Sequence, residues 1–95
     1  MFLKDLAQIS RGTLLGESLN VNDFSIDSRS IKKGQLYIAL KGDNFDGHDF
    51  VEEALKKGAS AVVISKDLKG DFPRIVVKDT KEFINSIAAN NRKEF

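Results

Sequence analysis

Residues 35–65, QLYIALKGDNFDGHDFVEEALKKGASAVVIS, hold two short apolar runs separated by a polar loop and an amphipathic segment. The runs at 35–40 and 61–65 are almost continuously apolar, which is typical of strands covered on both faces of a sheet. Between them, apolar side chains recur at helical spacing and predict a helix over 49–57. Because strand–helix–strand units cross over with one hand, the two strands are expected to be parallel if they share a sheet.

The rest of the chain adds elements at both ends of this unit. Residues 66–73 are rich in turn formers and predict a connector. We predict an α/β fold: a small three-layer-like domain with a mixed or mostly parallel sheet and about three helices, whose strand order the sequence does not specify. The additional elements are a helix over 3–10 that stops at Gly12, strands over 13–15, 24–26 and 74–77, and a last helix from Asp79 to about Lys93.

Acidic residues mark two predicted helix starts. Asp49 with Glu52, and Asp79 with Glu82, have capping-box spacing, so each aspartate is expected to begin a helix. In the first of these helices, Phe50 is expected to lie on the buried face with the other apolar side chains.

Composition limits the possible functions. The chain has 95 residues, 15 basic and 14 acidic side chains, and no cysteine. This length suits one domain, and the balanced charge gives no basic surface for nucleic acid. The longest apolar run is far shorter than the ~20 residues of a membrane span, and the N-terminus does not resemble a signal peptide. We therefore expect one domain over residues 1–95, cytoplasmic, with no nucleic-acid partner and no membrane insertion.

The loop KGDNFDGHDF, residues 41–50, invites two ligand hypotheses that its residues do not complete. Gly42 and Gly47 have the glycine spacing of a phosphate-binding loop, but no lysine and hydroxyl follow the second glycine. Asn44, Asp46 and Glu53 have calcium-loop spacing, but Gly42 stands where the first carboxylate belongs. The structural interpretation of the two glycines is that they supply positive φ at a tight turn.

Two polar clusters remain as candidate sites. His48, the only histidine, has no partner for a metal pair or a catalytic triad, so a hydrogen-bonded position at the helix entry is the simpler interpretation. For Asp27-Ser28-Arg29 the structural interpretation is that Asp27 caps a turn and pairs with Arg29. If the strands before the two clusters are parallel neighbours, both clusters open at the edge where α/β folds bind ligands. No nucleophile–base pair is visible, so no catalytic or metal-binding residue is assigned.

The order of these motifs resembles a known family. DSRSIKKGQLYIALKGDNFDGHDF followed by A-x-x-x-G-A-x-A-V-V-I, from Asp27 to Ile64, is similar to the N-terminal domain of the Mur ligases. The closing I-V-V-K-D-T…I-A-A-N-N-R-K-E-F looks most like the branch that adds D-alanyl-D-alanine to UDP-N-acetylmuramoyl-tripeptide. The branch that adds the third residue of the stem peptide shares DSR and DGHDF and is the alternative.

The resemblance implies a role for each loop. In this family the first domain holds the uridine diphosphate end of a UDP-N-acetylmuramoyl-peptide. Phe45 would cover the uracil face while Asn44 reads its edge, and Ser28 would contact the UDP-sugar. His48 belongs to the motif and is expected to organise the loop before it contacts ligand. The substrate-binding residues implied are Ser28, Arg29, Asp43, Asn44, Phe45 and His48.

The resemblance also implies parts that these 95 residues lack. Family ligases use ATP and Mg²⁺, held by a central domain that begins with a G-K-T loop, and no G-K-T occurs here. We expect the central ATPase domain to be the partner of this chain, and the central and C-terminal domains to be absent from it. No cofactor is expected in this part, which should bind substrate but not ligate it alone. A non-enzymatic interaction module of the same fold is the other hypothesis.

Overall fold

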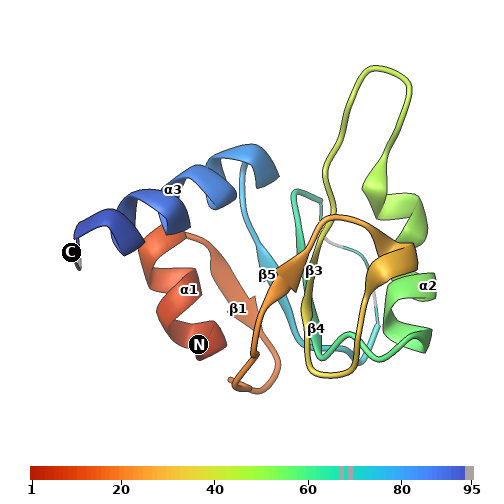
Figure 1. Cartoon of the computed structure of the whole chain (residues 1–95), viewed down its shortest axis with the longest axis horizontal. Helices are drawn as coiled ribbons and strands as arrows, with labels where there is room; N and C mark the ends of the chain where they lie inside the picture. The colour runs from red at the N-terminus through yellow and green to blue at the C-terminus, as the bar shows by residue number, and fades with distance from the viewer. Residues whose placement is uncertain (67, 69, 94–95) are drawn as a thin grey trace.

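A five-stranded sheet runs through the molecule with helices on both faces, as the computed structural model shows (Figure 1). The structure describes residues 1–66, 68 and 70–93; Asp67 and Lys69 of the expected connector therefore lie outside the described residues. The strand order is β1-β5-β4-β3-β2, with β2, β3, β4 and β5 parallel and β1 antiparallel to β5. The strands are β1 (Thr13–Leu15), β2 (Phe24–Ser25), β3 (Leu36–Ile38), β4 (Ala61–Ile64) and β5 (Arg74–Val76).

The helices form the two outer layers. Helices α1 (Leu3–Ser10) and α3 (Thr80–Lys93) lie beside each other on one face of the sheet, and α2 (Val51–Lys56) covers the opposite face (Figure 1). Two short 3₁₀ turns, Ser28–Ser30 and Gly47–Phe50, come before α2. The predicted α/β class, mixed sheet and three helices are confirmed within the described residues.

Alternation along the central strands builds a core on each face. Leu36 and Ile38 of β3 pack on the α1–α3 side, whereas Tyr37 and the following Ala39 pack on the α2 side. All four side chains are fully buried. The near-continuous apolar run therefore supplies apolar side chains to both faces of the sheet, as a strand covered on both faces requires. The parallel pairing of β3 with β4 also confirms the crossover predicted from residues 35–65.

The start of α2 differs from the prediction. Its N-cap is Phe50, with no side-chain cap, so the prediction that Asp49 caps this helix is wrong. The capping aspartate is Asp46, which accepts a 3.0 Å bond from the His48 amide because a 3₁₀ turn comes before the helix. At the last helix the prediction holds, since Asp79 accepts a 2.8 Å bond from the Lys81 amide.

Phe50 is also not buried as expected, with 36% of its surface exposed. It lies on the 3₁₀ turn rather than on the apolar stripe of α2, where Val51 and Ala54 are buried.

The end of α1 assigns different tasks to two adjacent residues. Arg11, not Gly12, takes the left-handed conformation that ends the helix, with φ of 58°. Gly12 is needed for space: a Cβ there would lie 2.7 Å from Val77 Cγ1 and 2.8 Å from Ile75 Cγ2. Both neighbours belong to the core between α1 and the sheet, so this glycine sets how closely the chain passes β5.

We predict that Gly12→Ala lowers the free energy of unfolding by about 1–3 kcal/mol, because it overpacks the core beside Ile75 and Val77. Arg11→Gly is the control, expected to change stability by less than ~1 kcal/mol, because relief of the left-handed strain offsets the added chain entropy. Urea unfolding of the three proteins measures both values. Equal stability of Gly12→Ala and the parent would contradict the prediction, because it would show that Ile75 and Val77 move aside at no cost in free energy.

Candidate functional site

A groove of about 470 Å³ lies at the carboxyl ends of β2 and β3. These strands are parallel neighbours, which meets the condition left open by the sequence, so the segments that follow them emerge at the same edge of the sheet. Three predicted site residues, Ser28, Arg29 and Phe45, line the groove. The other lining residues are Ile26, Asp27, Phe50 and Glu53.

An aromatic pair forms one wall of this groove. The rings of Phe45 and Phe50 stack with centroids 5.4 Å apart and planes 13° from parallel. Both are unusually exposed for phenylalanine, at 51% and 36%. Sequence reasoning missed Phe50 and Ile26 as site residues because it assigned one to a helix core and the other to a strand. Exposed aromatic faces offer a flat apolar surface that suits a planar ring.

The Asp27-Ser28-Arg29 turn also lines the groove. The Asp27 carboxylate accepts bonds from the Arg29 amide at 2.9 Å and from its Nε at 3.3 Å, which confirms the predicted turn and ion pair. The amide bond first, then the guanidinium, lowers the pKa of Asp27. The remaining guanidinium nitrogens are available to a ligand, since the Arg29 side chain is 81% exposed.

Ser28 and Glu53 join this turn to α2. The buried Ser28 hydroxyl donates to Glu53 Oε2 at 3.4 Å, and Glu53 Oε1 lies 3.6 Å from Lys57 Nζ. Lys57 Nζ in turn donates to the Arg29 carbonyl at 3.3 Å. Glu53 is thus a groove residue that the sequence assigned only to a helix and to an incomplete calcium pattern.

The loop that carries Phe45 is held to the sheet by His48. Its Nε2 accepts a 2.9 Å bond from the Ser65 amide, so Nδ1 carries the proton and donates to Asp46 Oδ1 at 2.7 Å. The imidazole is 1% exposed. With both nitrogens engaged inside the protein, His48 organises the loop in this structure and offers no ring nitrogen to a ligand.

Asp46 is the acidic partner of this network. Its carboxylate accepts from the His48 amide and ring and lies 3.3 Å from Lys66 Nζ. The His48 amide is the first cause that lowers the pKa of Asp46 to about 2, followed by the His48 ring. The stabilisation that these bonds give is therefore complete above the usual carboxyl range and is lost as pH falls towards 2.

Gly47 fits into a space with no room for a side chain. A Cβ there would lie 2.8 Å from both the amide nitrogen and the carbonyl oxygen of Leu40, and 3.0 Å from the Tyr37 hydroxyl. The Tyr37 hydroxyl donates to the Gly47 carbonyl at 2.8 Å. Neither Gly42 nor Gly47 has positive φ, so that interpretation of the pair is wrong. Close approach of backbone to backbone is what requires glycine at position 47.

The loop does not cradle a phosphate, because its amides are already used. The Gly42 amide donates to the Phe45 carbonyl at 2.6 Å, and the Gly47 amide donates to the Leu40 carbonyl at 2.6 Å. The His48 and Asp49 amides both donate to Asp46. A phosphate-binding loop needs free amides that converge on the ligand.

The carboxylates of the calcium-like pattern are likewise already paired. Asp46 contacts His48 and Lys66. Glu53 contacts Ser28 and Lys57. Among the described residues, no three His, Cys, Asp or Glu side chains gather as a metal site would require.

Asp43 and Asn44 lie elsewhere in the loop. Both are exposed, and neither lines the groove beside Phe45. The structure thus brings Ser28, Arg29 and Phe45 together, places His48 behind them as a support, and leaves Asp43 and Asn44 at the exposed part of the loop.

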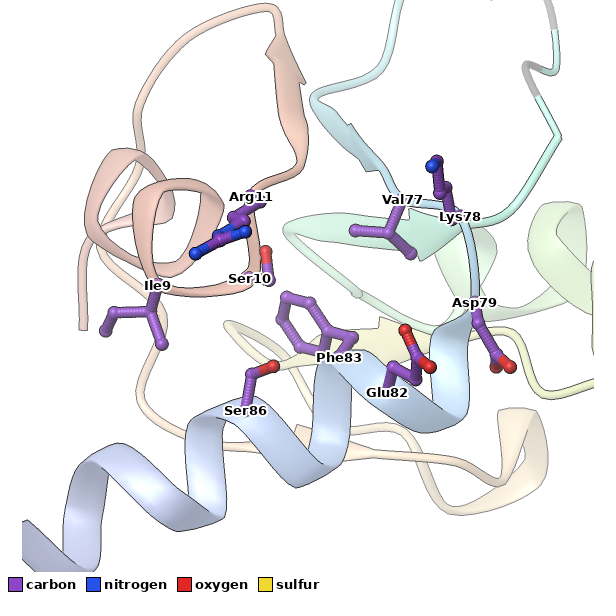
Figure 2. Close-up of a pocket in the computed structure, with 9 residues that line it drawn as sticks. All are labelled: Ile9, Ser10, Arg11, Val77, Lys78, Asp79, Glu82, Phe83 and Ser86. Carbon is purple, nitrogen blue, oxygen red and sulfur yellow. The ribbon is translucent and has the colours of Figure 1, made fainter.

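A second cavity of about 470 Å³ lies between the end of α1 and the start of α3, away from the predicted residues (Figure 2). Ile9 and Phe83 face its interior, and Glu82 and Ser86 of α3 point towards the same space (Figure 2).

Within the described ranges, no helix combines the length and apolar character of a membrane span.

Comparison of the sequence with known protein families identifies the family of this α/β domain. Residues 20–92 match the model of the Mur ligase family, catalytic domain. The chain belongs to the Mur ligase family.

Two curated members of the family show which of its ligases this chain resembles. The chain is 42% identical over 92 residues to the UDP-N-acetylmuramoyl-tripeptide–D-alanyl-D-alanine ligase of Buchnera aphidicola, covering 97% of this chain and 20% of the relative. It is 40% identical over 68 residues to the UDP-N-acetylmuramoyl-L-alanyl-D-glutamate–2,6-diaminopimelate ligase of Aquifex aeolicus, covering 72% of this chain and 14% of that protein. The chain spans about a fifth of the length of the first of these curated relatives.

A solved structure shares the fold. The crystal structure of MurF from Acinetobacter baumannii superposes with a TM-score of 0.85 at 24% identity, over 96% of this chain and 21% of that one. At this identity the similarity establishes the architecture alone.

We predict that the single tyrosine ionises far above its usual range. Burial, then the nearby carboxylates Asp27, Asp46 and Glu53, raises the pKa of Tyr37 from 10.0 to about 12. Because the folded pKa is the higher one, the tyrosine's contribution to stability is complete below pH 10 and is lost as pH rises towards 12. Tyrosinate absorbance follows this group without interference, since the chain has one tyrosine and no tryptophan. A midpoint near 10.0 in the folded protein would contradict the buried bond to Gly47.

We further predict that His48→Ala lowers the free energy of unfolding by about 2–4 kcal/mol, since it removes a buried ring and leaves the Ser65 amide unpaired. Amide hydrogen exchange at Ser65 should quicken in parallel. Asp49→Ala, one residue away and exposed, is the control and should change stability by less than ~0.5 kcal/mol because Asp49 caps no helix. Similar losses in the two variants would disprove the anchoring role of His48.

Proposed function

We propose that this chain is the N-terminal, UDP-N-acetylmuramoyl-peptide-binding domain of an ATP-dependent ligase of peptidoglycan biosynthesis. The ligase would act in the cytoplasm and add D-alanyl-D-alanine to the muramoyl tripeptide. Family membership and the relative that carries this activity in its name support the assignment. The observation that carries the binding role is the groove, which is lined by both the exposed Phe45–Phe50 pair and the Ser28–Arg29 turn.

In this proposal the groove receives the uridine end of the substrate. The Phe45 ring lies against the uracil face, because aromatic rings favour stacking on flat partners. Ser28 and Arg29 give polar contacts to the nucleotide-sugar from their turn. Asp43 and Asn44 approach the edge of the base from the exposed part of the loop. His48 acts indirectly, since it fixes the loop on which these residues sit.

ATP and Mg²⁺ belong to the full-length ligase in this proposal. The described residues do not fit either group: the glycine-containing loop uses its own amides, and its carboxylates are paired internally. The central ATPase domain of the same polypeptide would hold the nucleotide triphosphate, and ligation would require it. These 95 residues therefore contribute substrate binding to the reaction.

A second candidate is the sister ligase that adds the third stem-peptide residue. The 40% identity to the diaminopimelate ligase of Aquifex aeolicus favours it, although over a shorter part of the chain. The acceptor substrates differ by one residue, so the two candidates separate when the full-length enzyme is assayed with UDP-N-acetylmuramoyl-dipeptide and with the tripeptide. Consumption of the tripeptide with D-alanyl-D-alanine supports the first candidate, and consumption of the dipeptide supports the second.

We predict that Phe45→Ala weakens binding of UDP-N-acetylmuramoyl-tripeptide roughly tenfold, because one base–aromatic stack is lost. Ser28→Ala and Asn44→Ala should also weaken it. Phe2→Ala is the matched control, since Phe2 is a phenylalanine of similar exposure, 48% against 51%, outside the groove. Calorimetric titration measures all four variants. Failure of the parent to bind any uridine nucleotide at millimolar concentration, or an equal loss in Phe2→Ala, would refute the binding role.

A further inference from the structure

A separate cavity of about 240 Å³ lies at the carboxyl edge of the sheet, beyond the groove. The chain leaves β3 towards α2 on one face and leaves β5 towards α3 on the other, with β4 between them. In open α/β sheets this divergence opens a crevice in which ligands bind. The crevice is lined by Lys41, Ser65, Lys78, Asp79, Thr80 and Lys81.

The lining brings together cations from separate segments. Lys41 follows β3, Lys78 follows β5, and Lys81 lies in the first turn of α3. In the part of the chain that the structure describes, these three ammonium groups make no ion pair or hydrogen bond. By contrast, Lys56 and Lys57 each lie within 4.0 Å of a carboxylate. Like charges that outnumber the counter-charge beside them repel one another, and an anion between them would offset this cost.

One carboxylate, that of Asp79, also lines the crevice and offsets part of the lysine charge. Asp79 Oδ1 accepts from the Lys81 backbone amide at 2.8 Å and thereby caps α3. Lys78 lies between this crevice and the cavity between α1 and α3 and lines both, and its side chain points away from Glu82 and Phe83 (Figure 2). The lining therefore keeps an excess of positive charge.

The floor of the crevice is fixed before any ligand arrives. Ser65 follows β4, and its amide is held by His48. Thr80, 3% exposed, starts α3 directly after β5. A rigid floor surrounded by long ammonium side chains is the chemistry that recognises phosphoryl oxygens.

We propose that this lysine crevice is a binding site for a phosphoryl group, of the size of phosphate or diphosphate. The group has two possible sources: the diphosphate of a nucleotide whose base lies in the Phe45 groove, or a free phosphate compound that binds independently. The Lys41 end of the loop borders the crevice and Phe45 of the same loop lines the groove, so one ligand could reach both. Only the first source rests on the proposed function.

Inorganic pyrophosphate, titrated into the parent and followed by amide chemical shifts, tests the crevice without any nucleotide. Shifts should appear at Ser65, Thr80 and Lys81. Lys78→Gln with Lys81→Gln should weaken binding roughly tenfold or more, because charge-assisted bonds are lost. Lys4→Gln with Lys56→Gln removes the same charge at exposed positions outside the crevice and should change binding less than about twofold. No shift at Ser65 and Thr80, or equal weakening in both double variants, would overturn the proposal.

A comparison of UDP with uridine identifies the source. If the phosphoryl group belongs to a nucleotide, UDP binds more tightly than uridine, and the Lys78 and Lys81 substitutions remove that advantage. Phe45→Ala then weakens UDP but not pyrophosphate. If the source is independent, uridine and pyrophosphate bind together without competition, and the lysine substitutions leave UDP unchanged. Pyrophosphate shifts in a protein that binds no uridine compound would retain the crevice and refute only the nucleotide role.

Discussion

Burial of β3 and β4 on both faces is the constraint from which the rest of the architecture follows. Their side chains are fully buried, so each face requires a layer of helix. The connection from β3 to β4 supplies α2 on one face, and the chain ends supply α1 and α3 on the other (Figure 1). With both faces covered, the carboxyl edge is the surface of these strands that stays open to a ligand.

The site depends on how one loop is fastened to that edge. Gly47 lets the chain touch the Leu40 backbone, Tyr37 bonds its carbonyl from beneath, and His48 bonds Ser65 across the sheet. These contacts fix the base of the loop, while Phe45 remains exposed further along it. Part of the conformational entropy of the loop is therefore lost during folding, so less has to be lost when a ligand binds in the groove.

Local patterns in the sequence predicted most elements, because the periodicities of strand and helix are local properties. Strand order was not predictable: β1 joins the sheet through β5, some sixty positions away in sequence, and nothing in TLL specifies that partner. The glycines were the residues whose structural roles the sequence predicted least well. Gly12 is required by Ile75 and Val77, which are distant in sequence, and Gly47 by the path of the loop back to the Leu40 backbone, so their roles appear only in three dimensions. Phe50 was misplaced because it lies on the 3₁₀ turn before α2, where its ring stacks on Phe45 instead of following the stripe of the helix.

The two outer strands of the sheet bear on how the protein behaves in concentrated solution. Strand β2 is two residues long and β1 is three, so each edge presents few unpaired backbone groups. Long, flat edges recruit strands from other molecules, whereas very short ones offer little to pair with. The shortness of both strands thus protects the domain from edge-to-edge aggregation, although Phe24 within β2 and Ile26 directly after it are exposed.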